Sequence, residues 1–285
     1  MRIGYIGLGL MGGPLARNLI RAGKDVLIYD LSKEAIERTL AAGITGTAAG
    51  SPDEMGDCEV VFTSLPLPAH VKNVMMSDSG LLNKMKKGSI YIDVSTIDPS
   101  TAEEIEAYAK QREIGFIAAP LGKGPAQAEK AEEGIFAGGE KYYFEKILPL
   151  LNIVGSPVCY LGGVKQAYAF KLITNMIGMT NLAVVSEGLH LAAQAGIDRN
   201  QFLQFVAETG GNSHQMQTRG PWIVNGDFAN RFGVSLALKD VTLGCEMAGD
   251  WGYDARFAKL AKQFYEKADQ AGLGKEDCSA VYKVL

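Results

Sequence analysis

The sequence predicts an α/β protein with an N-terminal, doubly wound parallel sheet, a long interdomain helix and an all-helical C-terminal domain. Three observations support this fold class. Short apolar runs alternate with helical stretches up to about residue 160, a long apolar stretch without proline follows, and no strand-like run comes after it. We therefore expect a sheet domain over residues 1–162, the long helix over 163–194 and the helical domain over 195–285.

The elements of the first domain follow from two apolar patterns. Continuous apolar runs indicate strands, and segments with apolar residues at intervals of three and four indicate amphipathic helices. The expected strands are 2–6, 25–29, 60–65, 89–94 and 116–121, with 135–139 and 158–162 as later candidates, and the expected helices are 14–23, 33–43 and 101–113. Their alternation indicates βαβ units, and hence a parallel sheet with helices on both faces.

The pattern changes after residue 163. The stretch from about Lys165 to Ala195 has few polar positions and is expected to form one long helix that ends at Gly196, a residue type common at helix C-termini. Because so apolar a helix suggests burial between subunits as well as domains, we expect a homodimer or homotetramer. Further helical patterns cover 201–209, 232–252 and 255–272.

Composition argues against several classes of function. The net charge of −4 leaves no basic face for nucleic acid or an acidic membrane, so we expect neither as a partner. The four cysteines are scattered, without a CxxC pair and away from the three histidines, which indicates reduced thiols and no metal site. The first strand begins at residue 2 and the longest apolar stretch is broken by Gly178, Thr180 and Asn181. We therefore expect a cytoplasmic protein without a targeting peptide or membrane span.

A glycine-rich motif, Gly7-Leu8-Gly9-Leu10-Met11-Gly12, directly follows the first strand. In such a motif the first glycine makes a tight turn, the second lets the backbone approach a pyrophosphate, and the third allows the helix to pack closely on the strand. The helix N-terminus then faces the anion. Asp30 ends the second strand, about 20 residues further on, where an acidic group accepts hydrogen bonds from the adenosine ribose. Together these features predict a Rossmann dinucleotide-binding domain, whereas the alternative is a glycine-rich turn followed by an ordinary aspartate.

Asp30 also predicts that the cofactor is NAD in preference to NADP. The carboxylate can accept hydrogen bonds from free ribose hydroxyls, whereas a 2′-phosphate would meet like charge, and the next residue is Leu31 rather than an arginine. Lys33 could swing toward such a phosphate, which leaves NADP open.

Lys171 and Asn175 are the candidate chemical groups, because no Ser-His-Asp set, catalytic carboxylate pair or Tyr-xxx-Lys dyad stands out. They are four residues apart, so both lie on one face of the long helix. A lysine ammonium there could polarise a carbonyl and donate its proton as an alkoxide develops, with the amide orienting a substrate oxygen. The alternative is a lysine at the helix edge whose charge stays in solvent.

The chain resembles the β-hydroxyacid dehydrogenase family through a series of motifs in register. They are GLGLMGGPLARNL from Gly7, SLP at 64–66, DVSTIDPSTA from Asp93, APLGKGPAQAEKAEEG from Ala119, FKLITNM from Phe170 with EGLHLAAQAGID after it, and LALKD at 236–240. The resemblance implies an NAD(P)-dependent oxidoreductase that interconverts a small acidic β-hydroxy compound and its semialdehyde or keto form. The alternative is a catalytically silent dinucleotide-binding protein for recognition or assembly, and Lys171 is the residue that such a protein would lack.

The resemblance also implies roles for individual residues. Cofactor-binding residues would be Leu65 and Pro66 after the third strand, Thr96 near the nicotinamide, and Lys239 and Asp240, which would reach back from the helical domain. Substrate would be lined by Ser95 and Gly122-Lys123-Gly124, with Lys171 as acid/base and Asn175 beside it. The alternatives are a strand terminator at 65–66, a helix cap at 95–96 and a solvated pair at 239–240.

Three departures from the family pattern stand out. The usual Asp-Ala-Pro-Val-Ser-Gly-Gly loop is Ala118-Ala119-Pro120-Leu121-Gly122-Lys123-Gly124, the lead-in to the catalytic helix has Lys165 and Ala167 where glycines are common, and Thr174-Asn175 replaces Asn-Asn. The first departure places a cation in the substrate loop. We therefore hypothesise that Lys123 binds the distal anionic group of a small acidic substrate, with a solvent-pointing lysine as the alternative.

Overall fold

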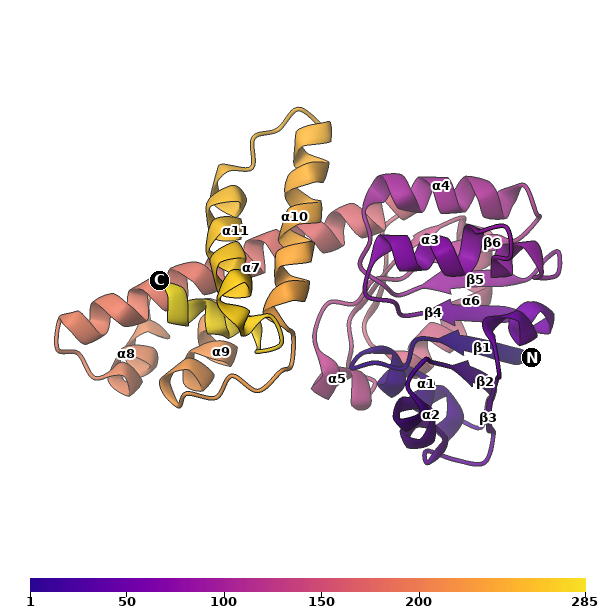
Figure 1. Cartoon of the computed structure of the whole chain (residues 1–285), viewed down its shortest axis with the longest axis horizontal. Coiled ribbons are helices and arrows are strands. Elements are labelled where there is room, and N and C mark those ends of the chain that lie inside the picture. Colours follow the sequence, from indigo (N-terminus) through magenta and orange to yellow (C-terminus); the bar gives the residue numbers. More distant parts are fainter. The chain divides into compact units, whose positions relative to one another are not determined.

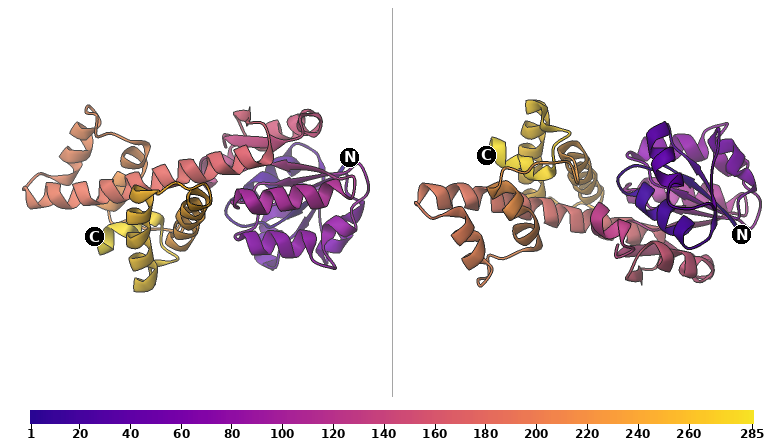
Figure 2. Two further views of the ribbon diagram at one scale, coloured as in Figure 1. Left: turned by 90° about the horizontal axis from the view of Figure 1, so that it is seen from above. Right: turned by 90° about the horizontal axis from the view of Figure 1, so that it is seen from below.

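The computed structural model describes all 285 residues and divides into two compact units, residues 1–171 and 172–285. The first unit contains a sheet flanked by helices, and the second is built from helices. The long helix α7 (Val164–Gln194) runs without a break from one unit into the other, as its salmon ribbon shows in Figure 2. The predicted fold class is thereby confirmed.

One eight-stranded sheet forms the centre of the first unit (Figure 1). Its strand order is β3-β2-β1-β4-β5-β6-β7-β8. Every neighbouring pair is parallel except β6 and β7. The order reverses between β1 and β4, and a parallel sheet binds ligands outside the carboxyl ends of its strands at such a switch point. The strands are β1 (Arg2–Ile6), β2 (Asp25–Tyr29), β3 (Gly46–Ala48), β4 (Val60–Thr63), β5 (Ile90–Asp93), β6 (Gly115–Ala118), β7 (Ile135–Gly139) and β8 (Val158–Tyr160).

Helices cover both faces of this sheet, each over its own apolar core. One core combines strand residues with α1 and α6, and the other combines them with α3, α4 and the first turns of α7. The helices of this unit are α1 (Gly12–Arg21), α2 (Lys33–Leu40), α3 (Pro68–Met76), α4 (Pro99–Lys110), α5 (Pro125–Glu129) and α6 (Lys141–Val154).

The sheet departs from the expected parallel arrangement at one place, because β7 runs antiparallel to β6. Residues 119–134 between them form no crossover helix that spans the sheet, and only the five-residue α5 lies there. Sequence patterns also missed β3, which has three residues, and α6, which continues through Pro149. A proline inside a helix removes one backbone hydrogen bond, so sequence patterns treat it as a helix end.

The second unit is built around the C-terminal half of α7. Met179, Leu182, Val185 and Leu189 of that helix pack in one core with residues of α10 and α11. By length and composition α7 could cross a membrane, as core helices of water-soluble proteins also can. Its first turns likewise supply Tyr168 to a core of the first unit, so packing within each unit accounts for part of its apolar character. The other helices are α8 (Arg199–Val206), α9 (His214–Val224), α10 (Val234–Asp250) and α11 (Arg256–Ala268).

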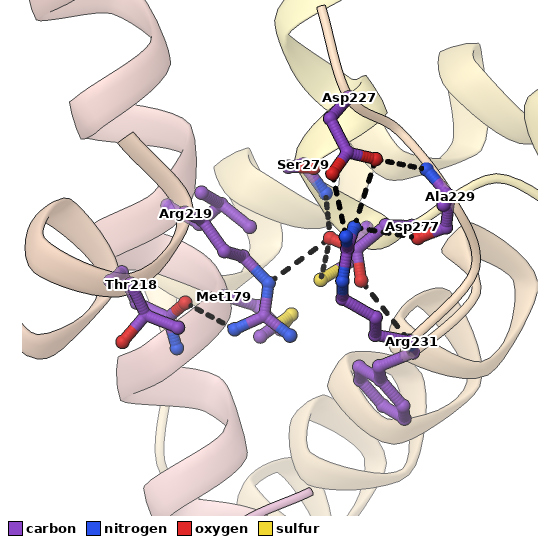
Figure 3. Close-up of polar contacts among 12 residues, drawn as sticks. Met179, Thr218, Arg219, Asp227, Ala229, Arg231, Asp277 and Ser279 are labelled. Atoms are coloured by element: carbon purple, nitrogen blue, oxygen red, sulfur yellow. Dashed lines mark hydrogen bonds and ion pairs between the residues drawn. The ribbon is translucent and has the colours of Figure 1, made fainter. Parts of the chain in front are cut away.

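A buried ion pair organises the C-terminal end of the second unit. Figure 3 shows the Arg219 guanidinium turned toward Asp277, and its Nε donates to Oδ1 at 3.1 Å. Asp277 is fully buried and also accepts hydrogen bonds from the backbone amides of Phe232 and Ser279, each at 3.1 Å. The carboxylate thereby connects α9, the segment before α10 and the short 3-10 helix Cys278–Val284.

Candidate functional site

The three motif glycines after β1 differ in what surrounds them. A Cβ on Gly7, whose φ is +91°, would lie 2.2 Å from the carbonyl oxygen of Ser64, and a Cβ on Gly12 would lie 2.0 Å from that of Gly7. Both positions therefore require glycine for the packing of the chain itself. A Cβ on Gly9 would meet no atom within 4 Å. The backbone at Gly9 is thus open to an external group, as a pyrophosphate-binding turn requires.

The N-terminus of α1 is suited to an anion. Its N-cap residue, Met11, makes no side-chain capping hydrogen bond, and the first turn contains no acidic residue. Amide groups at such an end have no partner within the helix and carry the positive end of the helix dipole. The loop after β1 also contacts the end of β4 through Gly7 and Ser64, at the switch point of the sheet. The residues present therefore fit a dinucleotide phosphate.

Asp30 has a structural role that the sequence did not reveal. Its Oδ2 accepts a hydrogen bond from the amide of Leu8 at 2.6 Å, and its Oδ1 accepts one from the amide of Ser32 at 2.8 Å. The carboxylate therefore fixes the start of the glycine loop. Each oxygen keeps a further lone pair, so Asp30 can still accept from a ribose hydroxyl. Leu8 itself is buried in the core, whereas Leu10 is exposed beside Gly9.

Asp93, the last residue of β5, joins several strand ends, although the sequence did not single it out as a site residue. It is fully buried, and its Oδ1 accepts hydrogen bonds from the hydroxyls of Thr63 and Ser95, both at 2.6 Å. Its Oδ2 accepts one from the Tyr168 hydroxyl at 2.5 Å. Burial raises the pKa of the Asp93 carboxyl, against the lowering effect of these hydrogen bonds.

Ser95 connects this network to the loop after β4. Its hydroxyl accepts a hydrogen bond from the amide of Leu65 at 2.9 Å while donating to Asp93. The alternative of a helix cap at 95–96 was wrong, because α4 is capped by Asp98, whose Oδ1 accepts from the Thr101 amide at 2.8 Å. The structure thus brings Leu65 and Ser95 together at the carboxyl edge. Of their predicted neighbours, Thr96 is half-buried and Pro66 is exposed.

Lys171 lies three residues after Tyr168 on α7 and is buried. Because Tyr168 donates to Asp93, the turn of α7 that carries Lys171 is tied to the end of β5. Burial raises the pKa of Glu133, at the other end of the segment that carries Gly122-Lys123-Gly124, and the positive charge of Lys171 opposes that rise. The Lys123 ammonium donates to the backbone carbonyl of Glu132 at 2.8 Å.

Three predicted residues meet within the second unit. The Asn175 amide nitrogen donates to Oδ2 of Asp240 at 2.5 Å, and the ammonium of Lys239 lies 2.8 Å from Oδ1. Asp240 is only 2% exposed, so the alternative of a solvated pair at 239–240 was wrong. Asp240 therefore orients the amide of Asn175.

A separate cavity of about 430 Å³ lies at the amino ends of β5 and β6. The ionisable side chains that line it are Glu106, Glu113, Glu140 and Lys110, with Tyr143 beside them. Three carboxylates against one ammonium disfavour a dinucleotide phosphate there. The chain contains no group of three or more His, Cys, Asp or Glu residues placed to hold a metal ion.

Two family models together match nearly the whole chain. Residues 2–163 match the NAD binding domain of 6-phosphogluconate dehydrogenase, and residues 166–285 match the model described as NAD-binding of NADP-dependent 3-hydroxyisobutyrate dehydrogenase. The first match covers the glycine loop and Asp30. The second begins just before Lys171 and includes Asn175, Lys239 and Asp240.

Individual relatives are similar over nearly the whole of this chain. The chain is 30% identical over 285 residues to 2-(hydroxymethyl)glutarate dehydrogenase of Eubacterium barkeri, covering 100% of this chain and 94% of that protein. It is 30% identical over 284 residues to the chloroplastic glyoxylate/succinic semialdehyde reductase 2 of Arabidopsis thaliana, covering 99% of this chain and 79% of that protein. The crystal structure of a 3-hydroxyisobutyrate dehydrogenase from Salmonella typhimurium superposes with a TM-score of 0.91 at 30% identity, covering 100% of both chains.

Proposed function

The chain belongs to the β-hydroxyacid dehydrogenase family, and from this we infer that Lys171 is the acid/base residue of its reaction. The protein is an NAD(P)-dependent oxidoreductase that acts on a CH–OH group and interconverts hydroxy acids and their semialdehyde or keto forms. A catalytically silent dinucleotide-binding protein is not favoured. The observation that carries our assignment is the burial of Lys171 on the turn of α7 that Tyr168 ties to the end of β5.

The dinucleotide is held, on this proposal, by the open backbone at Gly9, the N-terminus of α1 and the carboxylate of Asp30. When bound, the nicotinamide supplies or accepts the hydride. We propose that NAD is preferred, because Asp30 directly follows β2 and no arginine comes next. The roles of Leu65, Thr96 and Lys239 toward the cofactor stay predictions.

Lys171 handles the proton. In the reducing direction its ammonium donates a proton to the carbonyl oxygen as the carbonyl carbon gains a hydride, so a hydroxyl forms and a neutral amine remains. In the oxidising direction the neutral amine takes the hydroxyl proton. Asn175 lies one helical turn further along α7, and its amide, oriented by Asp240, is available to position a substrate oxygen.

We propose a small anionic substrate, recognised through Lys123. The Lys123 side chain is exposed and donates one hydrogen bond to the Glu132 carbonyl, which leaves two of its three donors for a substrate carboxylate, sulfonate or phosphate. Glutarate and succinic semialdehyde, named in two of the relatives, both carry such a carboxylate.

We also propose that the protein is a cytoplasmic homodimer or homotetramer without nucleic-acid or membrane partners. Ile177, Val184 and Leu191 recur every seventh residue along α7, and each is more than half exposed, which leaves an apolar stripe to cover. Its cysteines are free thiols, three of them buried, as in proteins of a reducing compartment.

The test of the function combines a substrate panel with one substitution. The wild-type protein should reduce small acidic semialdehydes with NADH. Lys171→Ala should lower kcat by about two to four orders of magnitude, the usual contribution of a positioned general acid, while NADH binding stays intact. Lys165→Ala removes the same charge from an exposed position on α7 and should leave kcat unchanged. Near-wild-type turnover in a Lys171→Ala protein that binds NADH would refute the assignment.

A further inference from the structure

The buried carboxylate of Asp93 receives hydrogen bonds from three separate chain segments. Thr63 at the end of β4 and Ser95 after β5 each donate a hydroxyl to Oδ1 at 2.6 Å, and the Ser95 amide donates to the same oxygen at 3.2 Å. From α7, the Tyr168 hydroxyl donates to Oδ2 at 2.5 Å. An ionised carboxylate offers acceptor sites only, so it can take all four donors. Asp93 is thus the common attachment point of β4, β5 and α7.

Tyr168 is the member of this network that comes from the helix of Lys171. Its ring is fully buried and packs in the core that contains α3 and α4. Burial and the negative charge of Asp93 raise the pKa of Tyr168 well above its usual range, so the hydroxyl keeps its proton and stays a donor. A phenylalanine at this position would keep the packing of the ring and lose only the hydrogen bonds of the hydroxyl to Asp93.

The position of Lys171 depends on the attachment of this turn of α7. Lys171 follows Tyr168 by three residues, and residues three apart are neighbours on the surface of a helix. Lys171 is also the last residue of the first unit, so the preceding turn determines where it lies relative to β5. The buried hydrogen bond from Tyr168 to Asp93 restricts both the rotation of that turn and its shift along the helix axis.

We propose that Tyr168 is a positioning residue for Lys171: its hydroxyl, held by Asp93, sets the place from which the Lys171 amine exchanges a proton with the reacting oxygen. The proposal rests on the role of Lys171 inferred above. Because Tyr168 is fully buried, it does not touch the substrate and acts only through the helix. Proton transfer requires the amine within hydrogen-bond reach of the carbonyl oxygen, so a small displacement of the amine slows the reaction strongly.

The same carboxylate also supports a loop on the predicted cofactor side. The Ser95 hydroxyl, which donates to Asp93, accepts a hydrogen bond from the amide of Leu65 in the loop after β4. Leu65 is among the residues expected to border the cofactor. Asp93 therefore gives the proton donor and this loop a common support, and neither can shift without loosening hydrogen bonds that lead to one carboxylate.

The test removes one hydroxyl and measures the chemical step directly. Tyr168→Phe should lower the single-turnover rate constant for NADH oxidation, with enzyme in excess over NADH and a saturating acidic semialdehyde, by about 10- to 100-fold. The Kd for NADH should not change, because Ser95 and Leu65 keep their hydrogen bonds. A partly unfolded preparation would instead lose amplitude and keep the wild-type rate constant. A wild-type rate constant in Tyr168→Phe would overturn the proposal.

Tyr91→Phe is the matched control. Tyr91 is a fully buried tyrosine of β5, and its hydroxyl lies 2.7 Å from the hydroxyl of Thr63. Because the single Thr63 hydroxyl proton goes to Asp93, Tyr91 is the donor, and this hydrogen bond stays within the sheet. The substitution therefore removes a buried hydroxyl from the same network without releasing α7, and the rate constant should equal that of the wild type. A loss as large as that in Tyr168→Phe would count against a specific role of Tyr168.

A double variant shows whether Tyr168 acts through Lys171. In protein that already carries Lys171→Ala, adding Tyr168→Phe should not lower the rate constant further, because no amine is left to position. Losses that multiply would mean that Tyr168 acts independently, contrary to the proposal. Wild-type turnover in Lys171→Ala would refute the proposed function itself. A slow Lys171→Ala protein together with an unchanged Tyr168→Phe protein would refute only the role of Tyr168.

Discussion

At the scale of single residues, substitution by alanine should weaken NADH binding at Gly9 and lower the stability of the fold at Gly7. Gly9→Ala adds a methyl group that meets no atom within 4 Å, so the melting temperature should not change. The methyl would occupy the space that a pyrophosphate approaches, and the Kd for NADH should rise about tenfold or more, as measured by fluorescence titration. Gly7→Ala should instead lower the unfolding free energy by about 1–3 kcal/mol, because its positive φ strains an alanine. Unchanged NADH affinity in Gly9→Ala would contradict the cofactor site.

Lys123→Met tests the substrate class. Methionine keeps the length and apolar stem of lysine but not its charge. The kcat/KM for an acidic semialdehyde should fall about 10- to 100-fold, the effect of losing one charge-assisted hydrogen bond, and the fall should be much smaller for a neutral aldehyde. An equal loss for both aldehydes would mean that Lys123 only supports its loop, through the Glu132 carbonyl.

The cofactor preference is also decided at one residue. With Asp30 at the end of β2, kcat/KM should be higher with NADH than with NADPH, because the carboxylate repels a 2′-phosphate. Steady-state kinetics with both cofactors at the same substrate concentration give the comparison. A higher value with NADPH would point to Lys33 or Arg38 as a phosphate ligand, since Arg38 lines a cavity of about 200 Å³ beside Gly9.

The sequence reveals site residues to different degrees. Gly7, Gly9 and Asp30 are predictable because the spacing of the fingerprint has a physical cause in phosphate and ribose binding. Asp93 and Glu133 are not. An aspartate at a strand end and a glutamate in the charged run Glu129–Glu133 have the same local pattern as solvated surface residues, and only the fold buries them.

At the scale of elements, α1 supports α5 as well as the glycine loop. The Asn18 amide donates to the carbonyl of Ala128 at 2.8 Å, and Arg17 and Arg21 both pair with Glu129. Hydrogen bonds from the two arginines lower the pKa of Glu129 to about 2. The helix whose N-terminus suits the cofactor phosphate therefore also fixes α5, so displacement of α1 would disturb both the glycine loop and α5.

Two aspartates of the second unit, each paired with an arginine, should differ in their contribution to stability. Asp277→Ala leaves the nearly buried Arg219 guanidinium without its counter-ion and removes the acceptor of two backbone amides. The unfolding free energy should fall by about 3–5 kcal/mol, measured by urea denaturation. Asp227→Ala breaks the more exposed pair with Arg231 and should have little effect. Equal losses of unfolding free energy in the two variants would show that burial does not increase the contribution of the Arg219–Asp277 pair to stability.

Elements are predictable where local pattern and tertiary structure agree. The central strands and the amphipathic helices α1, α2 and α4 follow the apolar periodicity closely. The direction of β7 and the presence of α6 depend instead on tertiary context. Pro149 is accommodated in α6 because buried residues on both sides of it, Ile147 and Leu150 among them, pack on the sheet.

At the scale of the whole molecule, α7 explains why the domain limits are hard to predict from the sequence. The division between the two units falls within this helix, between Lys171 and Leu172, where the apolar pattern continues without interruption. Hydrophobic residues on either side of that point look alike in sequence, yet Tyr168 belongs to a core of the first unit and Met179 to the core of the second. The limits 1–162, 163–194 and 195–285 accordingly stay predictions.

The antiparallel pairing of β7 with β6 has a consequence for how this scaffold can diversify. Because β6 ends and β7 begins at the carboxyl edge, residues 119–134 leave and re-enter the sheet on the same side. Such a segment can be exchanged or lengthened as a cassette, since no strand order or crossover depends on its length. The α5 contacts with α1 are the constraint that any graft would have to reproduce. Selectivity for the carbonyl compound could then evolve while nucleotide recognition at β1 and β2 stays intact.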